Sequence, residues 1–104
     1  MNQIVLSIVV NASYGGFSLS LEAAEQLEAA SCGKFLSVGR QSAYWHGPRH
    51  DARLVEVVER LGEAASGACA ALEVLVVDGP SYRIVEHDGY ERVETPSTIR
   101  WVSV

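Results

Sequence analysis

Two residues in the stretch WHGPRHD, residues 45–51, are suited to holding a small anion that carries a ring. Trp45 offers a flat aromatic face on which a base could stack, and Arg49 offers a planar guanidinium that suits phosphate. The pattern also fits a structural role, in which Trp45 is core, Arg49 is solvated and Asp51 only caps a helix. Both interpretations stay open on the residues alone.

Metal or covalent chemistry would require the histidines and cysteines to converge. His46 and His50 are four residues apart, but Pro48 excludes the continuous helix that would bring them onto one face. The cysteines, Cys32 and Cys69, form no C-x-x-C pair, and no oxyanion loop accompanies them. We therefore predict no metal, no cofactor and no catalytic residue, and we expect two buried free thiols.

A glycine-rich loop, Asn11–Ser18, follows an apolar run and precedes a helical pattern. Such a junction can gather free backbone N–H groups, which attract phosphate. Gly15-Gly16 is the flexible point of this loop. The spacing matches neither a Walker A motif nor a dinucleotide fingerprint, and the alternative is a tight connection that needs glycine for its geometry.

Two further groups lie late in the chain. Glu86, Asp88 and Glu91 could exchange protons, but acids at the tip of an exposed hairpin are usually solvated. Arg100 precedes Trp101, and both residue types are enriched at interfaces. A strand with alternating faces would instead bury Trp101 and expose Arg100. We count Arg100 among the candidate ligand-binding residues and expect the acids to be solvated.

Runs rich in β-branched and aromatic residues predict the strands that would position these groups. They are Ile4–Val10, Leu72–Val77, Tyr82–His87, Tyr90–Thr95 and Thr98–Val104. Between the third and fourth runs, Asp88-Gly89 favours a two-residue type I′ turn. The stretch from Lys34 to Pro48 predicts a short strand or a structured loop.

Two amphipathic stretches predict helices. The first follows a serine cap, Ser18 or Ser20, and is expected to run to about Ala30, with Gly33 as the left-handed residue that ends it. The second follows the cap Asp51 and is expected to stop at Gly67. We predict an α+β fold, with a mostly antiparallel sheet and two helices packed on one face, because that arrangement buries the apolar faces of all elements.

The chain has 104 residues and a formal net charge of −5. The length suits a single domain, residues 1–104, whose modest core would gain from self-association, so we expect a homo-oligomer. Scattered basic residues on an acidic chain argue against nucleic acid, whereas a small anion needs only a few arginines. The apolar N-terminal run is far shorter than the ~20 residues of a membrane span, and no signal peptide is visible. We expect a cytoplasmic protein without a membrane partner.

Several segments in this order resemble small proteins encoded by phages and prophages. They are Tyr14–Ser20, Arg49–Asp51 with Arg53–Glu59, Gly62–Gly67 and Tyr82–Glu91. Within that group, the chain resembles the anti-Thoeris signal sponges, which are small, multimeric and not enzymes. That family sequesters the cyclic ADP-ribose isomers made by bacterial TIR-domain sensors, and some members also hold cyclic oligonucleotides at separate sites.

The resemblance implies that this chain sequesters a cyclic ADP-ribose-like nucleotide, without cleaving it, in the cytoplasm of a host cell. Aromatic faces would stack the base, and arginines or loop amides would hold the pyrophosphate. Chosen by residue type, the ligand-binding residues are Gly15, Gly16, Phe17, Trp45, Arg49 and Arg100. The alternatives are an inhibitor that binds a host defence protein directly, as anti-CRISPR proteins do, and a small nucleotide hydrolase.

Overall fold

The computed structural model describes residues 5–79 and 81–96. Its strands are β1 (Val5–Asn11), β2 (Leu36–Val38), β3 (Ala43–Trp45), β4 (Leu72–Asp78), β5 (Arg83–His87) and β6 (Tyr90–Glu94). Its helices are α1 (Leu21–Ala29) and α2 (Ala52–Leu61), with short 3-10 turns at Gly33–Phe35 and Gly62–Ala65. The predicted α+β class is confirmed. The predicted strand Thr98–Val104, and with it Arg100, lies outside the described residues.

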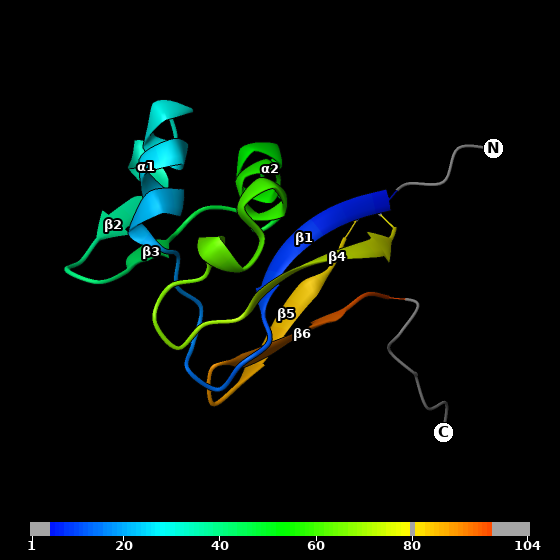
Figure 1. Ribbon diagram of the computed structural model, residues 1–104. Coiled ribbons are helices and arrows are strands. Elements are labelled where there is room, and N and C mark those ends of the chain that lie inside the picture. The colour runs from blue at the N-terminus through cyan, green and yellow to red at the C-terminus, as the bar shows by residue number, and fades with distance from the viewer. Residues whose placement is uncertain (1–4, 80, 97–104) are drawn as a thin grey trace, which may run out of the picture.

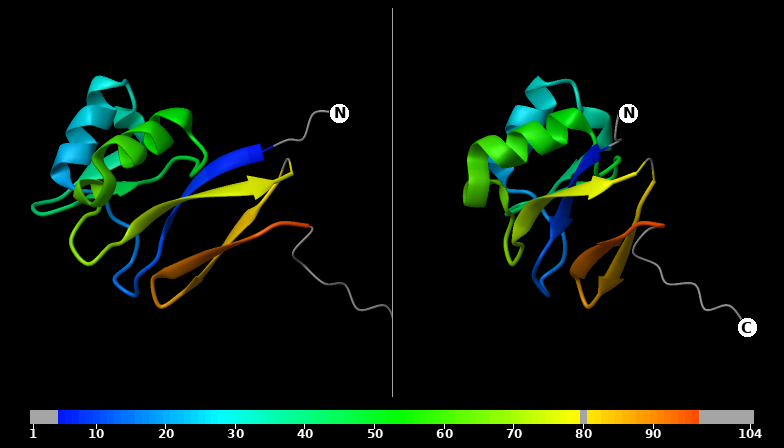
Figure 2. Two further views of the ribbon diagram at one scale, coloured as in Figure 1. Left: turned by 45° about the vertical axis from the view of Figure 1, so that its right-hand side comes forward. Right: turned by 90° about the vertical axis from the view of Figure 1, so that its right-hand side faces the viewer.

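The strands form three separate two-stranded antiparallel ladders, β1–β4, β2–β3 and β5–β6. Both helices lie on one side of the β1–β4 ladder, and the β5–β6 hairpin lies on its other side (Figure 1, Figure 2). β6 does not join β1 because other groups occupy that edge. Arg49 O accepts from Val9 N at 3.0 Å, and a side-chain oxygen of Glu91 accepts from Asn11 N at 2.9 Å.

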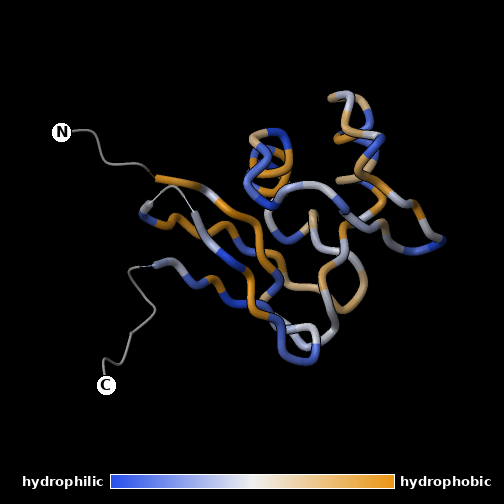
Figure 3. The backbone as a smooth tube through the Cα atoms, turned by 180° about the vertical axis from the view of Figure 1, so that it is seen from behind, coloured by the Kyte–Doolittle hydropathy of each residue, from blue (hydrophilic) through white to orange (hydrophobic). Residues whose placement is uncertain are grey.

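The β1–β4 ladder is the apolar centre of the fold, and β1 is among its most hydrophobic segments (Figure 3). Side chains alternate between the two faces of each strand. Val9, paired with Val74, joins the core beneath the helices, whereas Ile8, paired with Leu75, faces the β5–β6 hairpin. No helix among the described residues combines the length and apolar character that crossing a bilayer requires.

Helix α1 begins as predicted, because the Ser20 side chain accepts a hydrogen bond from Ala23 N. The helix ends at Ala29, close to the predicted end near Ala30, but the left-handed residue that follows it is Ser31 and not the predicted Gly33. Ser31 takes the left-handed conformation, with φ 67°, and Cys32 N then donates to Leu27 O at 2.9 Å. This is a Schellman closure, and the burial of Cys32 explains why a serine accepts the strained position.

Helix α2 is capped by Asp51, which accepts from Arg53 N and Leu54 N, as predicted. The helix stops at Gly62, with φ 59°, and the prediction of Gly67 is wrong. Gly67 instead allows its main chain to pack closely against Ser18, Leu19 and Ser42. A Cβ at Gly67 would collide with the side chain of Ser18 and with that of Ser42.

The β5–β6 hairpin has the predicted turn. Asp88 and Gly89 both have positive φ, 51° and 89°, and His87 pairs with Tyr90 across them. This is the two-residue geometry of a type I′ turn, so that prediction is confirmed. The hairpin brings Glu91 back against β1.

Candidate functional site

Arg49 is held inside the molecule by Glu91. Its Nη1 and Nη2 donate to the two carboxylate oxygens of Glu91 at 2.6 and 2.9 Å, and its guanidinium lies 3.7 Å from the ring centroid of Phe17. The side chains are only 19% and 8% exposed. Most of the donors that Arg49 would offer to a ligand are therefore taken within the chain, and Arg49 is not solvated either.

Asn11 extends this pairing into a network that we call the buried junction: Asn11, Phe17, Arg49, Gly89 and Glu91. Asn11 Nδ2 donates to Gly89 O at 2.8 Å, and Asn11 Oδ1 accepts from Ala71 N at 2.9 Å. No buried side-chain nitrogen or oxygen among the described residues lacks a hydrogen-bond partner. The junction locks β1, the N-terminus of α2 and the β5–β6 hairpin together.

The position of Glu91 corrects a sequence prediction. Glu86 and Asp88 are exposed as expected, but Glu91 is buried. The signal was available in the alternation of β6, because Glu91 shares a strand face with Val93 and Thr95, which point inward. The sequence pattern was interpreted as a hairpin tip, whereas Glu91 lies one residue beyond the turn.

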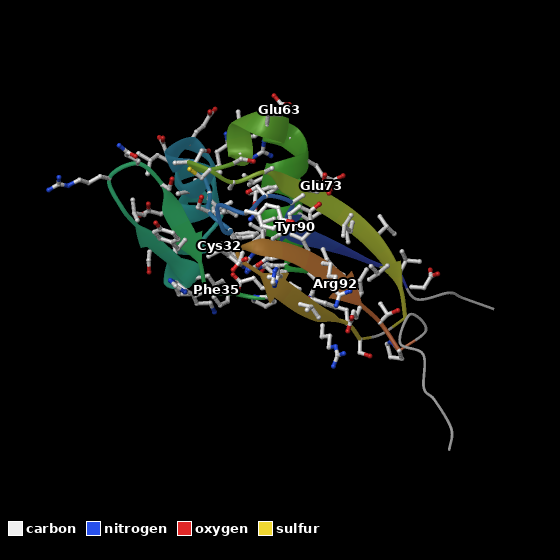
Figure 4. All side chains as sticks on the ribbon, turned by 90° about the horizontal axis from the view of Figure 1, so that it is seen from below. Cys32, Phe35, Glu63, Glu73, Tyr90 and Arg92 are labelled. Atoms are coloured by element: carbon white, nitrogen blue, oxygen red, sulfur yellow. The ribbon has the colours of Figure 1, made fainter. Side chains whose placement is uncertain are left out.

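Trp45 belongs to the core, as the structural interpretation of the sequence had it. Its side chain is 6% exposed, its ring lies 5.2 Å from that of Phe35, and its Nε1 donates to Pro48 O at 3.1 Å. A base could stack on Trp45 only after the core had opened. Figure 4 shows Phe35, with Cys32, at the end of the molecule that holds the β2–β3 hairpin, away from the labelled Arg92 of β6.

The thiols and histidines do not assemble a reactive centre. Cys32 is buried, as predicted, and burial raises the pKa of its thiol. The prediction for Cys69 is wrong, because it lies exposed in a turn whose carbonyl accepts from Ser13 Oγ. His46 is bonded to Ser37, and His50 to Tyr82. In the ranges that the structure describes, no three His, Cys, Asp or Glu side chains are grouped as metal ligands.

The glycine loop is a tight connection. A Cβ at Gly15 would collide with the main chain of Cys69, and Gly16 has a φ of 87°, which disfavours other residues. Gly89 of the β5–β6 turn also packs closely here, against the main chain of Tyr14 and Gly16. The glycines are therefore explained by the geometry of a tight connection, which was the structural alternative to phosphate binding. Gly15 and Phe17 nevertheless border an opening at the surface.

That opening is the open cleft, with a volume of about 340 Å³, between the glycine loop and the β2–β3 hairpin. Gly15, Phe17, Arg40, Gln41 and Tyr44 are among the residues that border it. Of the predicted ligand-binding residues, the structure brings Gly15 and Phe17 to this cleft. It places Trp45 and Arg49 elsewhere.

The walls of the open cleft are joined by backbone hydrogen bonds. Leu19 N donates to Ala43 O and Ala43 N donates to Leu19 O, both at 2.8 Å, so the hairpin is anchored to the end of the glycine loop. Ser42 Oγ accepts from Ala68 N at 2.9 Å and adds the third wall. These bonds hold the walls of the cleft next to one another.

Arg40 is distinguished from the other described arginines by its electrostatics. Each of the others forms an ion pair with a carboxylate, whereas Arg40 has no ion pair or hydrogen bond within residues 5–79 and 81–96. The main-chain N–H groups of Arg40 and Gln41 also have no partner in that part of the chain. An unneutralised cation with free donors is a group that an anion can bind.

The sequence analysis missed Arg40, although a signal was present. No Asp or Glu occurs between Glu28 and Asp51, and that stretch carries Lys34, Arg40 and Arg49. In an acidic chain, a locally basic stretch around a glycine-bounded turn indicates where cations lack local partners. The pattern was interpreted only as an irregular segment.

Comparison with known proteins gives no further assignment. No protein-family model matches the chain, and no match was found among curated proteins or solved structures. A functional proposal thus depends on the geometry of the open cleft and on the resemblance noted in the sequence.

Proposed function

We propose that this protein binds a small anionic nucleotide in the open cleft and sequesters it without turnover. The observation that carries the proposal is Arg40, a cation without a partner among the described residues of an acidic protein, positioned in a cleft. Leaving an arginine unpaired contributes little to folding, but it keeps all donors of a planar guanidinium available for phosphate.

The turn around Arg40 would supply further donors. The N–H groups of Arg40 and Gln41 follow one another along the main chain, and successive amides in a turn can form a concave anion site. Gly39 N already donates to Ser42 O at 2.8 Å, which fixes the turn that presents them. Guanidinium and amides together suit a phosphate or a pyrophosphate.

A ring beside this anion site would take the base. The Tyr44 side chain is 49% exposed and borders the open cleft, so its face is available for stacking without disturbing the core. The lining side chains are hydroxyls, one amide, one guanidinium and two rings, which hold and orient a ligand rather than exchange protons with it near pH 7.

The resemblance to the anti-Thoeris sponges supplies the ligand class within this proposal. It implies a cyclic ADP-ribose-like nucleotide, which has both the ring and the pyrophosphate that the open cleft would bind, in the cytoplasm of a host cell. The cleft volume lies near the lower end of known ligand pockets, about 300–1,000 Å³. The remainder of such a ligand would be covered by a second copy, in keeping with the homo-oligomer we predict.

Isothermal titration with cyclic ADP-ribose, ADP and a cyclic dinucleotide tests this site. Arg40→Ala should weaken binding by tenfold or more, on the order of the 1.5–3 kcal/mol of a charge-assisted hydrogen bond. Arg83→Ala is the matched control, because Arg83 is also exposed but pairs with Glu94 away from the cleft. Equal affinity of the wild type and Arg40→Ala would refute the site.

Recovery of the ligand tests sequestration. After incubation and heat denaturation, the nucleotide should return intact and in the amount that was bound. A cleaved nucleotide would contradict sequestration and favour the hydrolase. A stoichiometric host protein in pull-downs that is retained by Arg40→Ala would favour the direct inhibitor instead.

A further inference from the structure

Strand β4 has a free edge on the side away from β1. In an antiparallel ladder, only every second residue bonds to the neighbouring strand. Val9 of β1 donates its N–H to Arg49 O instead of to β4, so its partner Val74 also directs its main-chain groups outward. Val76, two residues further on, has the same orientation, and none of the described residues bonds the outward N–H or C=O of either valine. We call the outward main chain of Val74 and Val76 the free edge.

The free edge lacks the features by which other edge strands avoid pairing. β4 pairs with β1 without a bulge, and it contains neither lysine nor proline. Its centre, residues 74–77, is entirely apolar, whereas charged residues interrupt β5 and β6. Val76 is 67% exposed, and Figure 4 shows β4, with its labelled Glu73, along the margin of the molecule. An exposed apolar edge of this kind accepts another strand.

The surroundings of the free edge limit what can be added to it. Leu72 N also points outward, but it donates to Ser66 Oγ at 2.9 Å, so an added strand can pair only from Val74 onward. The opposite edge of the ladder, on β1, is occupied toward its C-terminal end by Arg49 O and the Glu91 carboxylate. Growth of the sheet on the β4 side alone favours a closed pair of chains over a filament.

We propose that the free edge joins two copies of this chain into a dimer, in which β4 of one copy runs antiparallel to β4 of the other. The two-fold axis passes through Val76, so that Val76 of each copy exchanges both main-chain hydrogen bonds with Val76 of the other. The two β1–β4 ladders become one four-stranded sheet. This dimer goes beyond nucleotide binding in the open cleft and does not depend on it.

The register follows from exposure and charge. An axis at Val76 pairs the most exposed apolar residue of β4 with itself, and it sets Leu75 opposite Val77 of the second copy. Asp78 then lies opposite Val74 of the second copy, so that like charges are not directly opposed. An axis at Leu75 or Val74 would instead place a strand residue of the second copy opposite Leu72, whose N–H is already bonded. The edge is therefore complementary to itself, which is what an isologous dimer requires.

Sedimentation equilibrium of the full chain without nucleotide tests the dimer. The wild type should show a mass that rises from monomer to dimer with protein concentration. Val76→Lys and Val76→Glu should each raise the dissociation constant of the dimer by about tenfold or more, because two like charges would face each other. A mixture of the two variants should restore a dimer, detected as the heterodimer by native mass spectrometry. Val38→Lys is the control, since Val38 is 64% exposed on β2, and it should leave the dissociation constant unchanged.

Hydrogen exchange followed by NMR locates the contact. The Val74 and Val76 amides should become more protected as protein concentration rises, because they donate to the second copy. The Leu72 amide, which donates to Ser66 within the chain, is the internal reference, and concentration should not change its exchange rate.

The remaining outcomes each overturn the proposal. A monomeric mass up to millimolar concentration would mean that no second copy binds. Protection of Val76 that does not depend on concentration would assign the free edge to a contact within one chain. A dimer that survives both charged variants would lie on another surface, and charged variants that do not pair with each other would refute the register.

Discussion

Arg49 and Arg40 are nine positions apart in the sequence, but their surroundings in the structure differ. Arg49 lies in the buried junction, over Phe17 and paired with Glu91. Arg40 is exposed, borders the open cleft, and has no partner among the described residues. Residue type made Arg49 the better candidate for a ligand, whereas the placement of carboxylates favours Arg40. An arginine that has no carboxylate partner within the chain is therefore the better candidate for binding an anionic ligand.

The contrast also predicts where stability resides. A buried ion pair contributes modestly as a pair, but removing one partner is costly because the other charge stays buried alone. An unpaired exposed arginine has no such dependence. The junction should therefore be sensitive to substitution and the cleft tolerant, and four variants test this from the largest expected effect to the smallest.

Glu91→Leu should have the largest effect. It leaves Arg49 and Asn11 N without their acceptor and should lower the free energy of unfolding by about 3 kcal/mol, measured by urea denaturation. Glu86→Leu is the control, because Glu86 is paired opposite Glu91 in the hairpin but is exposed. If both variants lose the same stability, the junction is not the stabilising element described above.

Gly89→Ala should rank second. Its φ of 89° is unfavourable for alanine, and the added Cβ would collide with the main chain of Tyr14 and Gly16, so a loss of about 2 kcal/mol or more is expected in thermal melts. Gly62→Ala has a positive φ but open space around the Cβ, and should cost about 1 kcal/mol. A smaller loss for Gly89→Ala than for Gly62→Ala would show that the close approach is unimportant.

Asp51 and Arg53 are an intermediate case, since the pair is only partly buried. The Arg53 side chain, which donates to Asp51, lowers the pKa of that carboxyl below its usual range. A lowered folded-state pKa gives stability that is present above the ordinary pKa of aspartate and is lost as the pH falls through the folded value.

Asp51→Asn should therefore be up to about 1 kcal/mol less stable than the wild type at pH 7, and the difference should shrink below about pH 4. Urea midpoints measured from pH 7 to pH 2 check this. A difference that is constant over this range would mean that the charge of Asp51 contributes nothing.

Arg40→Ala should be the mildest change, shifting the free energy of unfolding by less than about 0.5 kcal/mol while weakening nucleotide binding. Differential scanning calorimetry without ligand measures the first quantity. A large loss of stability would show that Arg40 has a structural partner, and the contrast between the two arginines would fail.

The sequence predicted well what neighbouring residues determine. The caps Ser20 and Asp51, the type I′ turn at Asp88-Gly89 and the β4 strand follow from local chemistry, and they are confirmed. The end of α1 was predicted to within a residue, but its left-handed residue is Ser31 rather than Gly33, because Cys32 is buried. The end of α2 was missed because Gly67 serves distant neighbours instead.

The candidate site was harder to predict because it depends on long-range pairing. The Arg49–Glu91 pair joins residues 42 positions apart, and nothing near Arg49 in the sequence announces Glu91. Because Arg49 pairs with Glu91, most of its donors are not available to a ligand. Arg40 has no carboxylate near it in the sequence, because no Asp or Glu occurs between Glu28 and Asp51. The glycine loop was located correctly, since its position depends only on its strand and helix neighbours.

Phe17 touches both regions, with one side under the guanidinium of Arg49 and another at the cleft. We therefore expect ligand binding in the open cleft and the stability of the buried junction to be coupled through the ring of Phe17. The nucleotide proposed for the open cleft would contact Phe17 and restrain its stack with Arg49, so saturating ligand should raise the melting temperature by more than the Arg40 contact alone explains. Substitutions that destabilise the buried junction should, in turn, lower the affinity for the nucleotide even where the substituted residue does not border the cleft.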